Sequence, residues 1–181
     1  MLEASRLDAG VVAPKLEVFR LKDLFDQLDR EFTAMANQRE IGFRVVATNL
    51  AVFSDPHLLR RILQNFLSNA VRYTSQGGVL LGCRRRGNVL RIEVWDTGPG
   101  IPLDKRREIF QEFRRLKTPE YDKAEKGLGL GLAIAERISR LLNHPINLRS
   151  WWRHGSVFSV DVPLGEMPLI SPVLTQPTVD N

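Results

Sequence analysis

Two stretches of apolar residues at helical spacing constrain this chain most, because each can bury its apolar side only as a long helix. The first predicts a helix over residues 21–38. The second begins at Ser54-Asp55-Pro56, a typical helix start with proline in the first turn, and predicts a helix that ends near Tyr73. Shorter runs around both stretches have the composition of strands, so the chain must combine helices with a sheet.

The expected strands are joined mostly by short turns rather than by helices. Residues 42–48 and 50–53 are expected to pair about a turn near Asn49, and Gly87-Asn88 is typical of a two-residue hairpin turn. Strands joined in this way pair antiparallel, and helices should then cover one face of one sheet. The sequence predicts strands at about 16–19, 42–48, 50–53, 79–85, 89–95, 146–151 and 156–162, a short helix around 105–113 and a longer one over about 128–142.

Charge, cysteine content and hydropathy exclude several kinds of protein. The single cysteine, Cys83, excludes a disulfide framework and a cysteine-rich metal site. The net charge of +5 is modest, and no Lys or Arg follows Arg153, so we expect no nucleic-acid partner. No apolar run approaches the roughly 18 residues that span a bilayer. We therefore expect no membrane contact by this chain and a cytoplasmic location, although a longer parent protein can still be membrane-anchored.

The second long helix carries a polar stripe beside its apolar face. Asn65 and Asn69 are four residues apart and project from one side of the helix, and Arg72 and Tyr73 continue that stripe. Amide oxygens can coordinate Mg²⁺, and an arginine can meet a phosphate directly. A solvated helix face is the alternative that this segment alone leaves open.

A carboxylate ends the apolar face of the strand over 89–95. By the period of two, Asp96 lies on the same face as the apolar side chains before it, where it must be hydrogen-bonded to be buried. Gly98 and Gly100 follow it and allow a ligand to approach the backbone closely. An adenine would offer a flat apolar body and an amine donor to this carboxylate. The alternative is a plain turn with Asp96 as its capping acceptor.

A run of alternating glycines precedes the last predicted helix. Gly127, Gly129 and Gly131 would let a phosphate approach the N–H groups at the start of that helix. A P-loop is excluded because Gly131 is followed by Leu132-Ala133 rather than by Lys and Ser or Thr. A dinucleotide fingerprint is excluded because Leu132 occupies its sixth position and no strand precedes the run. Close packing of small residues is the remaining alternative.

Four segments in this order, over about 70 residues, resemble the ATP-binding catalytic domain of sensor histidine kinases. That domain belongs to the GHKL (HATPase_c) family, together with gyrase, heat-shock chaperone and mismatch-repair ATPases. The resemblance covers about residues 15–163 and implies a Bergerat-type α/β two-layer sandwich, in which a mixed, mainly antiparallel sheet carries three helices on one face. It also makes the loop over 114–126 the expected ATP lid. The matching segments are 65–74, 96–102, 109–113 and 127–134.

The resemblance implies ATP and Mg²⁺ as cofactors and a role for each matching residue. Asn69 should hold Mg²⁺ with Asn65 beside it, and Asp96 should accept the adenine amine. Arg115, or its neighbour Arg114, should lie near the γ-phosphate, so these two and Asn69 are the expected catalytic residues. The other expected ATP contacts are Arg72, Tyr73, Gly98, Gly100, Ile101, Phe113, Gly127, Leu128, Gly129, Leu130, Gly131 and Leu132.

The phosphoacceptor of such kinases, a histidine followed by an acidic residue, is missing from this chain. His57, His144 and His154 do not fit that pattern and are expected to be surface or capping residues. Residues 1–14 resemble the end of the second dimerisation helix and its linker, and 164–181 are expected to be a flexible tail or linker. The implied activity is therefore transfer of the ATP γ-phosphoryl to a histidine on a dimerisation domain outside this chain.

This activity would place the chain in a bacterial two-component phosphorelay, with a response-regulator receiver domain acting downstream. The resemblance is compatible with a hybrid parent kinase, which carries its own receiver domain, and with a parent kinase that has none. The isolated chain is expected to be monomeric with little turnover. Two alternatives stay open: a catalytically silent regulatory module and an anti-sigma-type serine kinase. A hydrolase of the gyrase or chaperone type is disfavoured, because its catalytic Glu position is occupied here by Asn65, with Gln64 beside it.

Overall fold

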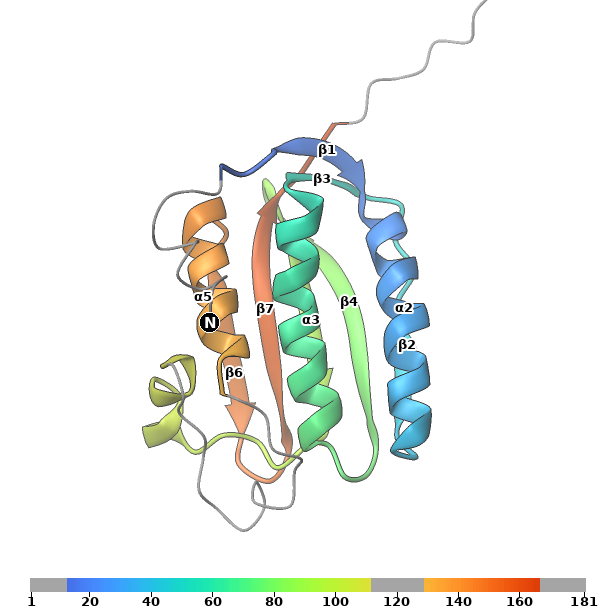
Figure 1. The fold of residues 1–181 in the computed structure, drawn as a ribbon, viewed down its shortest axis with the longest axis vertical. Coiled ribbons are helices and arrows are strands. Elements are labelled where there is room, and N and C mark those ends of the chain that lie inside the picture. The colour runs from blue at the N-terminus through green and yellow to red at the C-terminus, as the bar shows by residue number, and fades with distance from the viewer. Residues whose placement is uncertain (1–12, 112–128, 167–181) are drawn as a thin grey trace, which may run out of the picture.

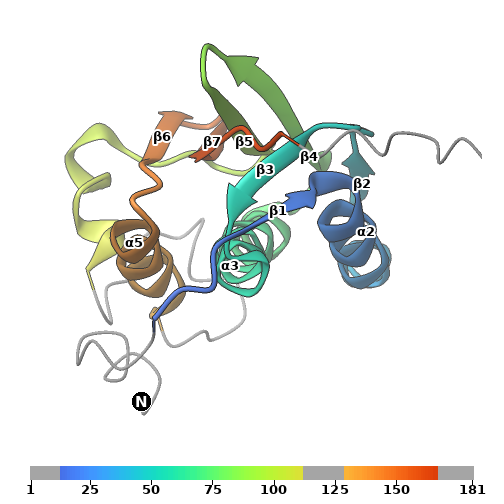
Figure 2. The same ribbon diagram turned by 90° about the horizontal axis from the view of Figure 1, so that it is seen from above.

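The chain folds into one layer of helices on one face of a sheet (Figures 1 and 2). The structure is a computed structural model that describes residues 13–111 and 129–166. The helices are α2 (Leu21–Gln38), α3 (Pro56–Tyr73) and α5 (Gly131–Leu142). The strands are β1 (Glu17–Arg20), β2 (Gly42–Val45), β3 (Ala51–Ser54), β4 (Gly78–Arg86), β5 (Val89–Asp96), β6 (Ile146–Trp151) and β7 (Gly155–Pro163).

The main sheet has five strands in the order β2-β4-β5-β7-β6. Only β2 and β4 pair in parallel, and the other three pairings are antiparallel. The expected two-layer α/β sandwich with a mixed, mainly antiparallel sheet is therefore confirmed. A second, two-stranded sheet of β1 and β3 lies across one end of the sandwich (Figure 1).

The expected pairing of residues 42–48 with 50–53 is wrong. β2 instead lies at an edge of the main sheet beside β4, and β3 pairs antiparallel with β1. Val52 on β3 is fully buried, and Phe43 on β2 packs against the same core. Each strand therefore contributes apolar side chains to the core while it is paired with a strand distant in sequence.

The core lies between the helices and the inner face of the sheet. α2 and α3 form at the predicted positions because their apolar stripes face this core, and α3 is capped by Asp55, whose side chain accepts hydrogen bonds from the backbone N–H groups of His57 and Leu58, both at 3.0 Å. The fully buried residues include Phe25, Phe32, Leu59, Phe66, Leu81, Leu90 and Ile92.

Three smaller expectations need correction. The short helix expected around 105–113 is present as two 3₁₀ turns, η1 (Leu103–Lys105) and η2 (Glu108–Phe110). The helix expected from about residue 128 begins at Gly131, because Gly129 has a φ of 69° and cannot be helical. His144 is not a surface residue: it is 3% exposed and its Nε2 lies 2.8 Å from the Ser54 Oγ.

The burial of His144 has a local cause. Asn143 ends α5 in the left-handed conformation, with a φ of 54°, and this turns the next residue inward.

Across residues 13–111 and 129–166, no helix is long and apolar enough to cross a membrane.

Candidate functional site

A cavity of about 390 Å³ lies where α3, the end of β5 and the start of α5 meet. Residues that are up to 93 positions apart in the sequence therefore contribute to one site. Of the residues that the sequence predicts to bind a nucleotide, the following line the cavity: Asn65, Asn69, Arg72, Tyr73, Asp96, Gly100, Ile101, Gly129, Leu130, Gly131 and Leu132.

The α3 wall of the cavity consists of the polar stripe predicted from helical spacing. Asn65, Asn69 and Arg72 lie on the side of α3 that adjoins its apolar face, while residues such as Phe66 on that face are fully buried. The packing of α3 against the sheet thus fixes the direction of the stripe.

Asp96 contributes a mostly buried carboxylate at the end of β5. It accepts a hydrogen bond from the backbone N–H of Gly98 at 2.8 Å and a second from the backbone N–H of Ser156, its cross-strand partner on β7. Burial raises the pKa of Asp96 to about 6, and the two backbone hydrogen bonds partly oppose that rise. Asp96 is thus a carboxylate held in place as a hydrogen-bond acceptor at the cavity wall.

The loop after Asp96 is held tightly against β6 and the turn that follows it. Gly100 has a φ of 67°, and a Cβ added there would lie 2.0 Å from the Trp151 carbonyl oxygen, so only glycine fits. The Ile101 N–H donates to the Ser150 Oγ at 2.7 Å. Gly98 does not line the cavity, but its N–H donates the hydrogen bond that orients the Asp96 carboxylate.

The start of α5 faces the asparagines of α3. A Cβ added to Gly131 would lie 2.9 Å from the Asn65 Oδ1, so the first turn of α5 and the Asn65 amide are in close contact. Leu130, at the N-cap, provides no side-chain hydrogen bond. The first N–H groups of α5 and the positive end of its dipole are therefore directed to the cavity, an arrangement that favours an anion.

The side chains present fit Mg²⁺ only in combination with a ligand. Asn65 and Asn69 supply amide oxygens, the hard donors that Mg²⁺ prefers. No group of three His, Cys, Asp or Glu side chains suited to a metal occurs in the part of the chain that the structure describes. A magnesium ion here would thus complete its shell with phosphate oxygens and water.

Some predicted residues belong to the part of the chain that the structure does not describe, and some lining residues were not predicted. Phe113, Arg114, Arg115, Gly127 and Leu128, and the lid expected over 114–126, lie outside the described residues. The lining residues that were not predicted as contacts are Ser68, Ala70, Pro99, Ile109, Ile134, Ser156 and Phe158. All but Ser156 and Phe158 belong to the four matching segments, and these two could have been found only from the β5–β7 register, which sets them opposite Asp96 and Val94.

Residues 54–166 match the profile of the histidine kinase-, DNA gyrase B- and HSP90-like ATPase family. The chain belongs to this family. Its members bind ATP, and the relatives below place the chain among the catalytic domains of sensor histidine kinases.

Curated relatives of this histidine kinase-type domain are much longer proteins. The circadian input-output histidine kinase CikA of Synechococcus elongatus is 36% identical over the whole of this chain and 24% of its own length. The sensor histidine kinase RcsC of Escherichia coli is 28% identical over 91% of this chain and 18% of its own length. The chain spans a quarter or less of these relatives, whose other domains lie outside the aligned region.

Solved histidine kinase structures share the fold. Full-length ShkA, crystallised in complex with AMPPNP, superposes with a TM-score of 0.80 at 30% identity, covering 92% of this chain and 35% of that chain. The catalytic domain of the histidine kinase ThkA superposes with a TM-score of 0.69 at 25% identity, covering 82% of this chain and 97% of that domain. The expected Bergerat-type fold of the histidine kinase catalytic domain is therefore confirmed.

Proposed function

We propose that this chain binds Mg·ATP and transfers the γ-phosphoryl group to a histidine on the dimerisation domain of its parent protein. One observation carries the proposal: a single cavity joins the mostly buried carboxylate of Asp96 to the paired amides of Asn65 and Asn69 and to the start of α5. The carboxylate can accept a hydrogen bond from a nucleobase, the amide oxygens can coordinate a cation, and the helix start can bind an anion.

The adenine is proposed to lie at the Asp96 end. The carboxylate accepts from the exocyclic amine, while Ile101 and Phe158 line the apolar part of the same cavity. Because Asp96 already accepts two backbone N–H groups, its orientation is set before the ligand arrives. The ligand therefore does not have to offset the entropy of ordering this side chain.

The phosphates are proposed to lie between α3 and the start of α5. The backbone N–H groups near Gly129 and Gly131 would donate to the phosphate oxygens, and Arg72 would supply positive charge. Asn69, with Asn65 beside it, would hold Mg²⁺, which neutralises charge on the phosphates when bound. The AMPPNP bound to ShkA supports a nucleotide triphosphate as the ligand.

The acceptor histidine is proposed to belong to another domain. All three histidines of the chain are described, and none of them lines the cavity. In the transfer, a ring nitrogen of the acceptor forms a bond to the γ-phosphorus as the bond to the β-phosphate oxygen breaks and ADP leaves. Arg114 or Arg115 would stabilise the negative charge on the transferring phosphoryl group. A receiver domain would take the phosphoryl group next. CikA and RcsC, as multidomain sensor kinases, support this division of labour.

Hydrolysis by this chain itself is disfavoured by the contacts of α3. A water molecule would need a base beside Asn69, and Asp96 is the only carboxylate among the described residues that line the cavity. Gln64 lies next to Asn65, the position of the catalytic Glu in the hydrolases, and donates to both carboxylate oxygens of Glu31 on α2 at 3.0 Å.

Calorimetric titration with ATP, with and without Mg²⁺, tests binding. We expect saturable binding that Mg²⁺ strengthens, and that Asp96→Asn abolishes. Asp104→Asn is the matched control, because Asp104 is an exposed aspartate of η1 that does not line the cavity. No binding by the unaltered chain, or equal binding by Asp96→Asn, would contradict the nucleotide assignment.

Phosphoryl transfer is tested separately with radiolabelled ATP and the separately purified dimerisation domain of the parent protein. Acid-labile label on its histidine is the expected result. Nucleotide binding without transfer would favour the silent regulatory module. Acid-stable label on a protein substrate would favour the serine kinase.

A further inference from the structure

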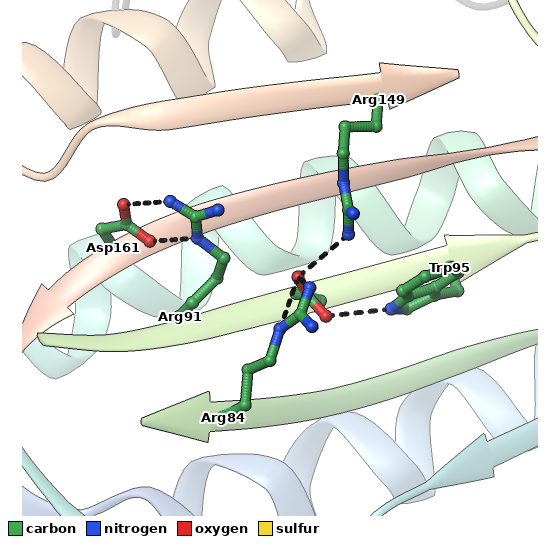
Figure 3. Close-up of polar contacts among 6 residues, drawn as sticks. Arg84, Arg91, Trp95, Arg149 and Asp161 are labelled. Atoms are coloured by element: carbon green, nitrogen blue, oxygen red, sulfur yellow. Dashed lines mark hydrogen bonds and ion pairs between the residues drawn. The ribbon is translucent and has the colours of Figure 1, made fainter. Parts of the chain in front are cut away.

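The face of the main sheet opposite the helices carries an ordered cluster of charged and aromatic side chains (Figure 3). At its centre is Glu93 on β5, whose side chain is only 8% exposed. Glu93 accepts hydrogen bonds from Arg84 on β4, from Arg149 on β6 at 3.3 Å and from the Trp95 Nε1 at 3.2 Å. Three strands therefore contribute to one polar network, on the face of the sheet opposite the cavity.

Arg149 and Trp95 are also in direct contact with each other. The Arg149 guanidinium carbon lies 5.4 Å from the centre of the Trp95 ring, within the range of a cation–π interaction. Between them in the register is Val157 of β7, which is 1% exposed although it belongs to the open face. The Arg149 side chain thus crosses Val157 to reach Trp95, and both are fixed above the sheet.

The side chains held in this way remain accessible. Arg84 and Arg149 are 44% and 45% exposed, and Trp95 is 37% exposed. Trp151, two residues after Arg149 on the same face of β6, is 48% exposed. We refer to these four side chains with Glu93 as the arginine–tryptophan platform. Tryptophan and arginine are the side chains most enriched where protein partners bind tightly.

The charge of the open face is not balanced. A single carboxylate, Glu93, serves two arginines, while Arg91 forms its own bidentate pair with Asp161 at 2.7 Å. On the strands of the main sheet, the outward positions carry five arginines against two carboxylates, which are Arg44, Arg84, Arg86, Arg91 and Arg149 against Glu93 and Asp161. An ion-pair cluster that served stability alone would not need this excess of three positive charges.

We propose that the arginine–tryptophan platform is a docking surface for an acidic segment of another protein, one that presents carboxylates on either side of an apolar side chain. The carboxylates would pair with Arg84 and Arg149, and the apolar side chain would cover Trp95 and Trp151. Because Glu93 holds both guanidiniums in place beforehand, little side-chain entropy is lost on binding.

The same observations disfavour nucleic acid as the occupant. A nucleic-acid backbone needs a continuous basic track. Here the Arg91–Asp161 pair and Glu93 interrupt the arginines, and the outward positions of the five strands hold no lysine. Arg84 and Arg149 lie on different strands rather than along a track. Two separate carboxylates on a protein segment therefore match them better than the evenly spaced phosphates of a nucleic acid.

A random-peptide display library selected on the full chain tests the proposal. The variant Arg149→Gln with Trp151→Ser removes two of the four exposed side chains of the platform but leaves Glu93 with Arg84 and Trp95, so the fold should hold. Arg30→Gln is the matched control, since Arg30 is an exposed arginine of the helical layer. Asp96→Asn is a second control, because it alters the cavity and not the open face. Thermal unfolding of each variant checks that it remains folded.

We expect the enriched peptides to carry several Asp or Glu residues around an apolar residue. Their dissociation constants should rise about tenfold or more in the platform variant and stay unchanged in both controls. The amide signals that shift on binding should be those of β4, β5 and β6. Peptides without acidic enrichment, or with equal affinity for the platform variant, would overturn the proposal. Tighter binding of an oligothymidylate than of any selected peptide would overturn it in favour of nucleic acid.

Discussion

Asp96 meets two requirements that act against each other. A buried carboxylate suits recognition of a base amine, but burial raises its pKa to about 6 and so makes its charged form unfavourable in the folded chain. Two backbone N–H groups, from Gly98 and Ser156, offset only part of that penalty. At neutral pH the folded chain therefore carries a charge that destabilises it, in a position where a ligand would use it.

The sign of the pH dependence follows from that raised pKa. In the unfolded chain Asp96 ionises near pH 4, whereas in the folded chain it ionises near pH 6. Between these values the folded state holds more protons, so its stability falls as pH rises and levels off above pH 6. We expect Asp96→Asn to remove this loss, so that the variant gains about 3 kcal/mol relative to the unaltered chain between pH 4 and pH 7. Urea unfolding across this range measures the difference.

Asp104→Asn is the control for that experiment, since Asp104 is an exposed aspartate that does not line the cavity. A difference in the free energy of unfolding between Asp96→Asn and the unaltered chain that does not change with pH would contradict the raised pKa of Asp96.

In the proposed complex, binding of ATP near pH 6 should also release a proton. Calorimetry in two buffers of different ionisation enthalpy detects it.

Gly100 gives a second prediction at this scale. Gly100→Ala places a Cβ 2.0 Å from the Trp151 carbonyl oxygen at a φ of 67°, so the loop after Asp96 must move. We expect a loss of about 3 kcal/mol in the free energy of unfolding. Gly87→Ala is the control, because Gly87 has a φ of 59° but no atom within 4 Å of its added Cβ. It should cost only about 1 kcal/mol, and equal losses in denaturant unfolding would show that the contact is not decisive.

Among the elements, α3 and α5 depend on each other at the site. α3 presents Asn65 and Asn69 only because its opposite side is packed in the core, and α5 begins at Gly131 directly against Asn65. Helix propensity alone would favour alanine at position 131. Glycine at this position leaves room for the Asn65 amide of the neighbouring helix.

Gly131→Ala separates these two effects. The added Cβ lies 2.9 Å from the Asn65 Oδ1, and the amide can move away, so we expect the free energy of unfolding to change by less than about 1 kcal/mol. Under the proposed function, the displaced amide should weaken Mg·ATP binding about tenfold while adenosine binding is unchanged. Calorimetry with both ligands tests this, and an equal loss for both would contradict a role of Asn65 on the phosphate side.

In the part of the chain that the structure describes, the α-helices all lie on one face of the main sheet (Figure 2). The cavity lies within the layer between helices and sheet, where β5, α3 and α5 all contribute to it. A ligand in it would therefore link elements from the middle and the end of the sequence. The platform on the opposite face uses three strands and no helix, and it adjoins the cavity loop where the Trp151 carbonyl lies against Gly100.

Nucleotide should accordingly stabilise the fold as a unit. At an ATP concentration about 100 times the dissociation constant, with Mg²⁺, mass action adds about 3 kcal/mol to the free energy of unfolding. For a chain of this size we expect Tm to rise by about 6 to 10 °C. Differential scanning fluorimetry measures this rise, which should be absent in Asp96→Asn; a rise in that variant equal to the wild-type rise would speak against the proposed adenine contact.

Much of the fold followed from local sequence. The bounds of α2 and α3, the hairpin of β4 and β5 and the inward position of Asp96 were predictable, because spacing, caps and turn residues act within a few positions. The polar stripe of α3 and the glycines before α5 were found for the same reason. Their roles toward ATP and Mg²⁺ stay predictions, as do those of Phe113, Arg114, Arg115, Gly127 and Leu128.

The sequence by itself thus determined the long helices and the strands, and it singled out most of the segments that line the cavity. Only the tertiary structure decided that β2 joins β4 and β3 joins β1, that Ser156 lies beside Asp96, and that His144 is buried against Ser54. It also decided the network of Arg84, Arg149 and Trp95 around Glu93. The reason is that a strand shows which side it can bury but not which strand it will pair with, since pairing depends on the competition among all strands for the same core.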